Sequence, residues 1–260
     1  MSRTRLASRA CSFALLAVLV CTGAARAQTV IESSSEARFQ LDFTAPAAAI
    51  ESRLPAGFTL AASAQGPAAN VNLRVIFIDR QTVHDAERRP VRSGSNQLVY
   101  LTVPVRDPNG TAGQLVIGGI TGDPADTPGP FGNYLPASRL SFSRTVSGEG
   151  GPVLDTQKWV FTAPTGEFIE MNVTLERAVG NRGGVSDARF YSSVNPNYVE
   201  ISSQEQLLDI ARNATTNPPD RVREFSFRAG GGSYADLFDG SEKVMSWDNI
   251  PWINRTVSVP

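Results

Sequence analysis

The chain has very few of the residues that most often bind metals or act as thiol nucleophiles. Its two cysteines, Cys11 and Cys21, both lie in the first 27 residues, and His84 is its single histidine. From residue 28 onward the chain cannot form a disulfide bond or build a zinc or iron site from cysteine and histidine ligands. We therefore expect no bound metal, and a fold held together by burial of apolar side chains.

Oxygen ligands leave one alternative to this expectation. Asp236, Asp239 and Glu242 lie close together around Gly240. Their spacing does not match that of an EF-hand calcium loop. We interpret the segment as a solvated turn, with a calcium site as the alternative.

Motifs for nucleophilic hydrolysis and phosphate binding are also absent. The chain has no G-x-S-x-G, G-x-x-x-x-G-K-[ST] or G-x-G-x-x-G segment, and no cofactor is expected. His84 is followed by Asp85 in a charged loop, which we interpret as an exposed histidine rather than part of a catalytic triad. An all-β chain could bring carboxyl groups together, but no spacing indicates a particular pair.

Lysine is almost as scarce, with Lys158 and Lys243 the only two. A lysine whose pKa is lowered by burial can form a Schiff base with a keto acid. Lys158 is adjacent to Trp159 in a predicted strand, so the two side chains face opposite ways. We expect Trp159 to lie in the core and Lys158 to face solvent.

The first 27 residues have the features of a secretory signal peptide. Arginines 3, 5 and 9 precede an apolar run over residues 12–20, and Ala25-Arg26-Ala27 supplies small residues for cleavage before Gln28. The run is too short to span a membrane. We expect a periplasmic or secreted protein with no membrane span.

Charge excludes another class of partner. The leader holds four arginines and no acidic residue, so the rest of the chain has 20 basic and 25 acidic residues. No basic patch with interleaved aromatic residues appears, and we do not expect nucleic acid as a partner.

Alternating apolar and polar residues predict about ten strands. The clearest places Ile169, Met171, Val173 and Leu175 on one face. The predicted strands cover residues 38–43, 70–79, 97–106, 114–121, 139–146, 153–162, 167–176, 188–194, 221–229, 243–247 and 253–259. We expect the polar segment 28–36 to be a mobile start.

Helices are few and short. Pro46 in a first turn predicts a helix over residues 47–54. The Ser202–Glu205 spacing is typical of a capping box, and apolar residues at 207, 208, 210 and 211 follow at helical spacing. Residues 233–239 are interpreted as one helical turn.

No long helix separates successive strands, and turns recur about every ten residues. This pattern excludes a parallel α/β fold and favours a mostly β, antiparallel barrel or sandwich with about two short flanking helices. No linker or internal repeat is evident, so residues 28–260 are predicted to form a single domain.

The segment 129–142, GPFGNYLPASRLSF, contains both turn residues and more apolar side chains than a simple connecting loop usually has. Proline and glycine exclude a helix here. The apolar side chains, Phe131, Tyr134, Leu135 and Leu140, indicate a loop that packs onto a core or lines a pocket.

The order of these segments resembles the acetoacetate decarboxylase family over most of the chain after the leader. The similarity lies in the strand 39–43, LPAGF at 54–58, strands 71–78 and 100–105, FGNYLPASRL in the central segment, the hairpin 159–175, and the end from Leu237-Phe238-Asp239-Gly240 to Pro251-Trp252 and Arg255. The resemblance implies a β-barrel around an apolar cavity. It also implies decarboxylation of a β-keto acid through a lysine Schiff base, with a second lysine lowering the pKa of the first.

The catalytic residues of that family are not retained. After Pro136 the lysine pair is replaced by Ala137 and Ser138, and the next cation is Arg139, which stays protonated. The family's substrate-side arginine falls at Thr44, and its barrel glutamate near Arg74.

Three hypotheses follow. The first is a barrel that binds a small organic ligand, acidic or a keto acid, with Arg74 and Arg139 as anion contacts and Tyr134, Trp247 and Trp252 as apolar walls. The second is a divergent decarboxylase or aldolase-type lyase that uses Lys158 or Lys243. The third is a protein-interaction module with the two tryptophans as an exposed patch. A homo-oligomer is an open alternative, and whether the protein is an enzyme is not decided.

Overall fold

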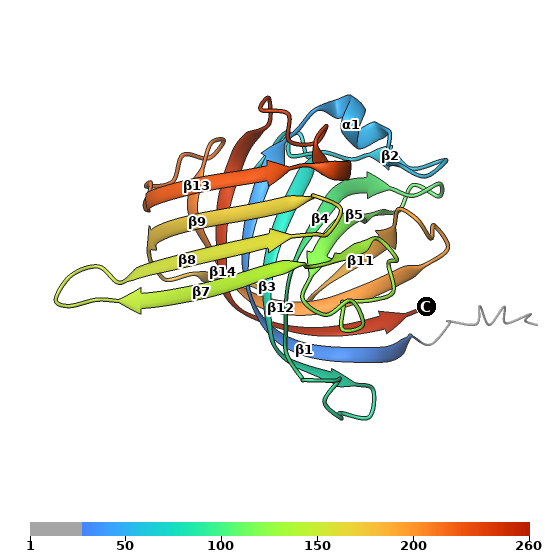
Figure 1. The fold of residues 1–260 in the computed structure, drawn as a ribbon, viewed down its shortest axis with the longest axis horizontal. Coiled ribbons are helices and arrows are strands. Elements are labelled where there is room, and N and C mark those ends of the chain that lie inside the picture. Colours follow the sequence, from blue (N-terminus) through green and yellow to red (C-terminus); the bar gives the residue numbers. More distant parts are fainter. Residues whose placement is uncertain (1–27) are drawn as a thin grey trace, which may run out of the picture.

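The computed structural model describes residues 28–260, and the predicted signal peptide lies outside the described residues. Seven strands form a closed barrel in the order β4-β3-β1-β14-β12-β11-β5, and β5 pairs back onto β4 (Figure 1). Neighbours are antiparallel except for the parallel pair β11 and β5. The barrel strands are β1 (Thr29–Thr44), β3 (Leu73–Asp85), β4 (Asn96–Arg106), β5 (Ala112–Thr121), β11 (Ser186–Ser192), β12 (Val199–Asn213) and β14 (Lys243–Val259).

A second, four-stranded antiparallel sheet lies across part of the outer face of the barrel (Figure 1). Its order is β13-β9-β8-β7. Three short strands extend the barrel sheet at its margins. The remaining strands are β2 (Thr59–Leu60), β6 (Tyr134–Pro136), β7 (Arg139–Ser147), β8 (Leu154–Thr162), β9 (Phe168–Glu176), β10 (Asn181–Arg182) and β13 (Val222–Gly230).

The main apolar core fills the space between the barrel and the second sheet. The rings of Phe77 and Trp159 are 5.7 Å apart between centroids, and those of Phe43 and Phe227 are 5.0 Å apart. The predicted alternation of β9 is confirmed, since Ile169, Met171, Val173 and Leu175 are all buried in this core. The structure therefore has the predicted mostly β, antiparallel barrel architecture.

Helical structure is minimal. The predicted helix after Pro46 is present as α1 (Ala47–Glu51), and residues Gly232–Tyr234 form a single 3₁₀ turn. The helix predicted from Ser202 onward is wrong, because these residues belong to strand β12. Two register shifts between β12 and β14 displace its alternation, and this places apolar residues at a spacing that resembles a helix.

Two further predictions are corrected by the long strands β1 and β14. The polar segment 28–36 is not a mobile start, because β1 begins at Thr29 and buries Ser34 and Glu36. The two strands predicted over 243–247 and 253–259 are one strand, β14. A register shift opposite Glu36 and Arg38 accommodates Pro251 without breaking the pairing.

The central segment 129–142 packs onto two cores. Phe131 is buried against Tyr198, with ring centroids 5.3 Å apart, in a smaller apolar cluster that includes residues of β3, β4 and β5. Leu135 and Leu140 pack against the main core. Within residues 28–260, no helix has the length and hydropathy needed to cross a membrane.

Candidate functional site

A cavity of about 300 Å³ lies inside the barrel. All seven barrel strands contribute to its wall, together with the loop before β3. Residues two apart on each strand face it, as alternation on the inner face of a barrel requires. The lining residues are Arg38, Gln40, Asp42, Pro67, Ala68, Arg74, Ile76, Tyr100, Thr102, Gln114, Ala188, Phe190, Gln204, Gln206, Leu208, Ile210, Asp248 and Ile250.

The wall of this cavity mixes polar and apolar side chains, whereas the family resemblance implies an apolar cavity. Four glutamines face it, from β1, β5 and β12. The Thr102 hydroxyl donates a hydrogen bond to Oε1 of Gln114 over 3.2 Å. Oε1 of Gln204 is buried and has no partner among the described residues. A buried acceptor without a donor is costly, so this atom favours occupation of the cavity by a molecule that can donate.

Two buried carboxyl groups lie side by side near one end of the cavity. Asp42 on β1 is 2% exposed and Asp248 on β14 is 7% exposed. The side-chain amide nitrogen of Gln40 donates to Asp42 Oδ1 over 2.9 Å and to Asp248 Oδ2 over 3.4 Å. The Ser246 hydroxyl donates to Asp248 as well. One amide nitrogen thus holds both carboxyl groups within a single polar site.

Burial changes the acidity of both groups. Burial and the neighbouring charge of Asp42 together raise the pKa of Asp248 to about 7, against the opposing effects of the Ser246 hydrogen bond and Arg74. Burial also raises the pKa of Asp42, against the charge of Arg74, whose Nε is 3.3 Å from Asp42 Oδ1. Asp248 therefore changes its charge near neutral pH, which is unusual for a carboxyl group.

Arg38 and Tyr100 lie deeper in the barrel. Nε of Arg38 donates to Oε2 of Glu36 over 2.7 Å, so its charge is already paired. Tyr100 is 2% exposed and lines the cavity. No residue of the described chain hydrogen-bonds its hydroxyl group, which is therefore available to a molecule in the cavity.

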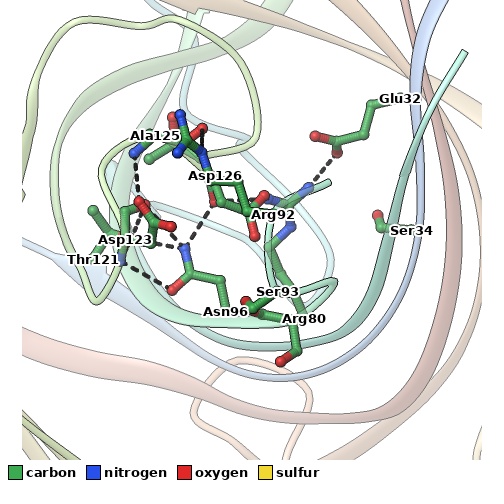
Figure 2. A network of polar contacts seen from close by, with 12 residues as sticks. Glu32, Ser34, Arg80, Arg92, Ser93, Asn96, Thr121, Asp123, Ala125 and Asp126 are labelled. Atoms are coloured by element: carbon green, nitrogen blue, oxygen red, sulfur yellow. Dashed lines mark hydrogen bonds and ion pairs between the residues drawn. The ribbon is translucent and has the colours of Figure 1, made fainter. Parts of the chain in front are cut away.

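A buried ionic network fills the barrel beyond Arg38. Along β1, residues 42, 40 and 38 line the cavity, and the next inward residues, Glu36 and Glu32, belong to the network. Arg80 is fully buried and pairs with Glu32, Glu36 and Asp126. Figure 2 shows Arg80 between Glu32 and the loop that carries Asp126. The cavity is thus closed at this end by paired charges.

A second arginine completes the network from the opposite side. Arg255 on β14 lies 2.7 Å from Glu32 and 3.4 Å from Glu36. Its guanidinium is also 3.9 Å from Glu200. Three arginines hold the pKa of Glu36 far below its usual range despite its burial, whereas burial raises the pKa of Glu200 to about 7.

Hydrogen bonds from Asn96 fix the loop that covers the network. Its side-chain nitrogen donates to the Thr121 hydroxyl over 2.9 Å and to the backbone oxygen of Asp126 over 2.8 Å (Figure 2). Asp123 accepts a hydrogen bond from the backbone nitrogen of Ala125. The closed end is therefore held by bonds between side chains and backbone, which favours a preformed cavity.

Only Arg74 of the five predicted contact residues lines the cavity. Tyr134 lies on β6, with its hydroxyl buried and without a partner among the described residues. Arg139 is exposed at the start of β7. Trp247 is buried below the guanidinium of Arg212, and Trp252 is partly exposed below that of Arg182. Contact of these five residues with a ligand stays a prediction.

The two lysines lie outside the cavity. Lys158 is exposed and Trp159 is 2% exposed, which confirms the predicted orientations of this strand. Lys243 is exposed at the start of β14. The positions of the family's lysine pair lie on the other side of the barrel wall. Ala137 packs against the main core, and Ser138 donates to the Thr162 backbone oxygen over 3.0 Å.

Sequence reasoning missed Gln40, Asp42 and Asp248, which form the polar site. The signal was present in β1, where Gln40 and Asp42 alternate with Phe39, Leu41 and Phe43. In an open sheet the polar face of such a strand faces solvent. In a closed barrel it faces the interior.

No group of three or more histidine, cysteine, aspartate or glutamate residues among residues 28–260 is placed to hold a metal ion. The pair Asp42 and Asp248, with Arg74 beside it, has too few free ligands for a hard cation. The arrangement instead provides two hydrogen-bonding carboxyl groups, one arginine and several amides for an organic molecule.

Comparisons with known proteins identify the fold and nothing narrower. No protein-family model and no curated protein matches the chain. Among solved structures, it is similar to an acetoacetate decarboxylase-like enzyme from Sphingomonas wittichii RW1, with 10% identity, a TM-score of 0.54, and coverage of 88% of this chain and 91% of that one. It is also similar to the enduracididine biosynthesis enzyme MppR, with 11% identity, a TM-score of 0.52, and coverage of 88% and 87%.

A structure of acetoacetate decarboxylase itself aligns with a TM-score of 0.47 at 11% identity over 88% of this chain and 87% of that one. The first two alignments cover nearly the whole described chain. The protein has an acetoacetate decarboxylase-like fold. At these identities the likeness does not extend to activity.

Proposed function

We propose that the protein binds a small polar organic molecule in the barrel cavity. The observation that carries this proposal is a preformed cavity whose buried polar groups are not all satisfied by the protein. Oε1 of Gln204 and Nε of Arg74 are buried at the cavity wall and lack a hydrogen-bond partner within the described chain. Buried polar groups are normally paired, so such groups at a cavity wall are expected where a ligand binds.

The size of the cavity limits the ligand. A volume of about 300 Å³ is at the low end of the range for small-molecule sites. Ile76, Phe190 and Ile250 supply apolar surface between the polar groups. The ligand is therefore a metabolite-sized molecule with a short apolar portion.

Arg74 is the contact for an acidic group. Of the two arginines that line the cavity, Arg38 is paired closely with Glu36. Arg74 makes one ion pair, with Asp42, and it is longer, with 3.3 Å between Nε and Oδ1. The two other guanidinium nitrogens of an arginine can hold a carboxylate in a fork geometry. A small organic acid, including a keto acid, fits this contact.

The proposed binding does not use a Schiff-base lysine at the family position. Ala137 and Ser138 stand there, and the two lysines lie outside the cavity. The similar enzyme MppR was solved with the condensation product of pyruvate and imidazole 4-carboxaldehyde. That complex supports a small organic ligand for this fold by analogy alone.

We further propose that the protein is exported and processed before Gln28. The support is the arginine-rich, apolar leader and its small residues before the cleavage position. An intact mass of the protein from an exporting host tests this directly. A mass that includes residues 1–27 would contradict it.

The binding proposal is tested by ligand-observed NMR on the processed protein. Saturation transfer should be seen with at least one member of a panel of small keto acids, hydroxy acids, amines and amino acids at millimolar concentration. The Ala188→Phe variant fills the cavity from β11 and should lose the signal. Arg89→Met, at an exposed position outside the cavity, should keep it. No transfer from any compound would overturn the proposal.

A further inference from the structure

Asp248 differs from most of the other buried carboxyl groups of the described chain in its partners. Glu36, Asp126, Asp155 and Asp209 each have an arginine within ion-pair distance. Asp42 and Glu200 have an arginine at 3.3 and 3.9 Å. Within residues 28–260, no arginine lies within ion-pair distance of Asp248. Its hydrogen-bond donors are the hydroxyl of Ser246 and the shared amide of Gln40.

Among residues 28–260, Glu167 is the other buried carboxyl group that has no arginine within ion-pair distance, but its charge is stabilised in another way. It accepts hydrogen bonds from the backbone nitrogen and hydroxyl of Ser233 and from the hydroxyl of Thr165. These bonds lower its pKa to about 2, so the protein itself stabilises that charge. It does not line the barrel cavity. Asp248 is the buried acid that faces the cavity without a cation.

We propose that the ligand carries a protonated amino group, held by Asp248 and Asp42, together with an acidic group held by Arg74. This inference rests on the proposed function and names its ligand class, a small amino acid or a similar zwitterion. An ammonium group has three donors. Two of them match the carboxyl groups of Asp248 and Asp42, which lie close enough to share the side-chain amide of Gln40.

The remaining wall is consistent with a cation near the carboxyl pair. The Phe190 and Tyr100 rings line the same cavity and can attract a cation through their faces. Gln204 Oε1 has no donor within the described chain, and the carboxyl pair has no closer cation than Arg74, so the wall favours a ligand that donates hydrogen bonds. A ligand with only a keto group and a carboxylate would offer these acceptors no donor.

Binding of an ammonium group should be coupled to proton release. The charged groups that face Asp248 are Asp42 on β1, Arg74 on β3 and Asp209 on β12, the last already paired with Arg221. At pH 6 the raised pKa, about 7, leaves Asp248 mostly protonated, and a bound cation favours its charged form. As the pH increases toward 7, affinity should therefore rise by up to about tenfold per pH unit, because one proton leaves for each ligand bound.

The test uses matched sets of an amino acid, its keto acid and its amine. Suitable sets are alanine, pyruvate and ethylamine; leucine, 4-methyl-2-oxopentanoate and 3-methylbutylamine; and phenylalanine, phenylpyruvate and phenethylamine. In the set that binds best by calorimetry, the amino acid should bind at least tenfold tighter than its two analogues. If a keto acid binds as tightly as its amino acid, this inference is overturned, but the proposed function still stands. No binding by any compound would overturn the proposed function itself.

Two variants separate the role of Asp248 from general damage to the fold. Asp248→Asn keeps the shape and removes the charge, and should weaken amino-acid binding at least tenfold while leaving the keto acid unchanged. Asp239→Asn, in an exposed turn, should change neither. Calorimetry at pH 6 in two buffers of different ionisation enthalpy should show release of about one proton in the wild type and none in Asp248→Asn. Equal amino-acid affinity in Asp248→Asn and wild type would overturn the inference.

Discussion

Asp42 on β1 and Asp248 on β14 lie on neighbouring strands inside the barrel and share one donor, the side-chain amide of Gln40. This arrangement places two buried acids at a cavity that one arginine only partly neutralises. The same barrel contains a second set of buried charges in which three arginines meet their acidic partners closely. The two sets differ in charge balance: the first has two acids beside one arginine, whereas in the second each carboxyl group lies within ion-pair distance of an arginine.

The pH dependence of stability gives a first prediction. The folded-state pKa of Asp248, about 7, exceeds its unfolded value, so the folded state binds more protons between about pH 4 and pH 7. This group therefore lowers the free energy of unfolding as the pH rises through that window, by a few kcal/mol (order of magnitude). Asp248→Asn removes the effect and should gain stability relative to wild type at pH 8 but not at pH 4.

Urea denaturation of both proteins at the two pH values measures this difference. Glu36, whose pKa is lowered, acts with the opposite sign in acid, and the comparison with wild type cancels its contribution. A stability difference between variant and wild type that does not change with pH would show that Asp248 titrates at its usual value.

The closed end of the barrel gives a second prediction. Arg80 is fully buried and its loss would leave Glu32, Glu36 and Asp126 without their shared cation. Arg80→Met should lower the free energy of unfolding by about 3–5 kcal/mol, as expected when one partner of a buried pair is removed. Arg89→Met, which removes ion pairs with Asp85 and Glu87 at the surface, should cost no more than about 1 kcal/mol. Equal effects of the two substitutions would contradict the importance of the network.

Arg74 gives a third prediction. Arg74→Met should weaken binding of any acidic ligand by at least about tenfold, because a charge-assisted hydrogen bond contributes about 1.5–3 kcal/mol. Affinity for an amine without an acidic group should not fall, since the charge of Asp42 is then free of Arg74. Calorimetric titration of Arg74→Met against wild type, with Arg89→Met as the exposed control, measures both effects. An unchanged affinity for acids would remove Arg74 from the site.

The exposed lysines give a fourth prediction. Borohydride treatment in the presence of pyruvate should produce no ligand adduct in the intact mass, because neither Lys158 nor Lys243 lies in the cavity. The alternative, a lyase with a relocated lysine, requires an adduct that disappears in Lys158→Ala or Lys243→Ala. Detection of such an adduct would favour that alternative over simple binding.

Sequence patterns predicted the strands that pack against the main core. In β9 and β8 successive side chains alternate between a buried face and an outer face, so strict alternation identified Trp159 as buried and Lys158 as exposed. The acetoacetate decarboxylase-like barrel was also predicted, from the order of the segments rather than from any catalytic motif. These features depend on local periodicity and on chain order, which a sequence contains directly.

The polar interior could not be predicted in the same way. Gln40 and Asp42 look like the solvent face of a strand until the barrel closes around them. Asp248 is more than 200 residues away from them and meets them only through the pairing of β1 with β14. Ser34 and Glu36 suggested a mobile start, because their arginine partners come from distant strands. In each case the decisive contact is made by tertiary pairing.

The central claim is that the barrel cavity holds a small organic molecule. Native mass spectrometry of the processed protein, with the amino acids and keto acids added, tests it most directly beside the Ala188→Phe variant. The account predicts a mass shift equal to one ligand in the wild type and none in the variant. A bare chain mass in both proteins, with every compound at millimolar concentration, would contradict it.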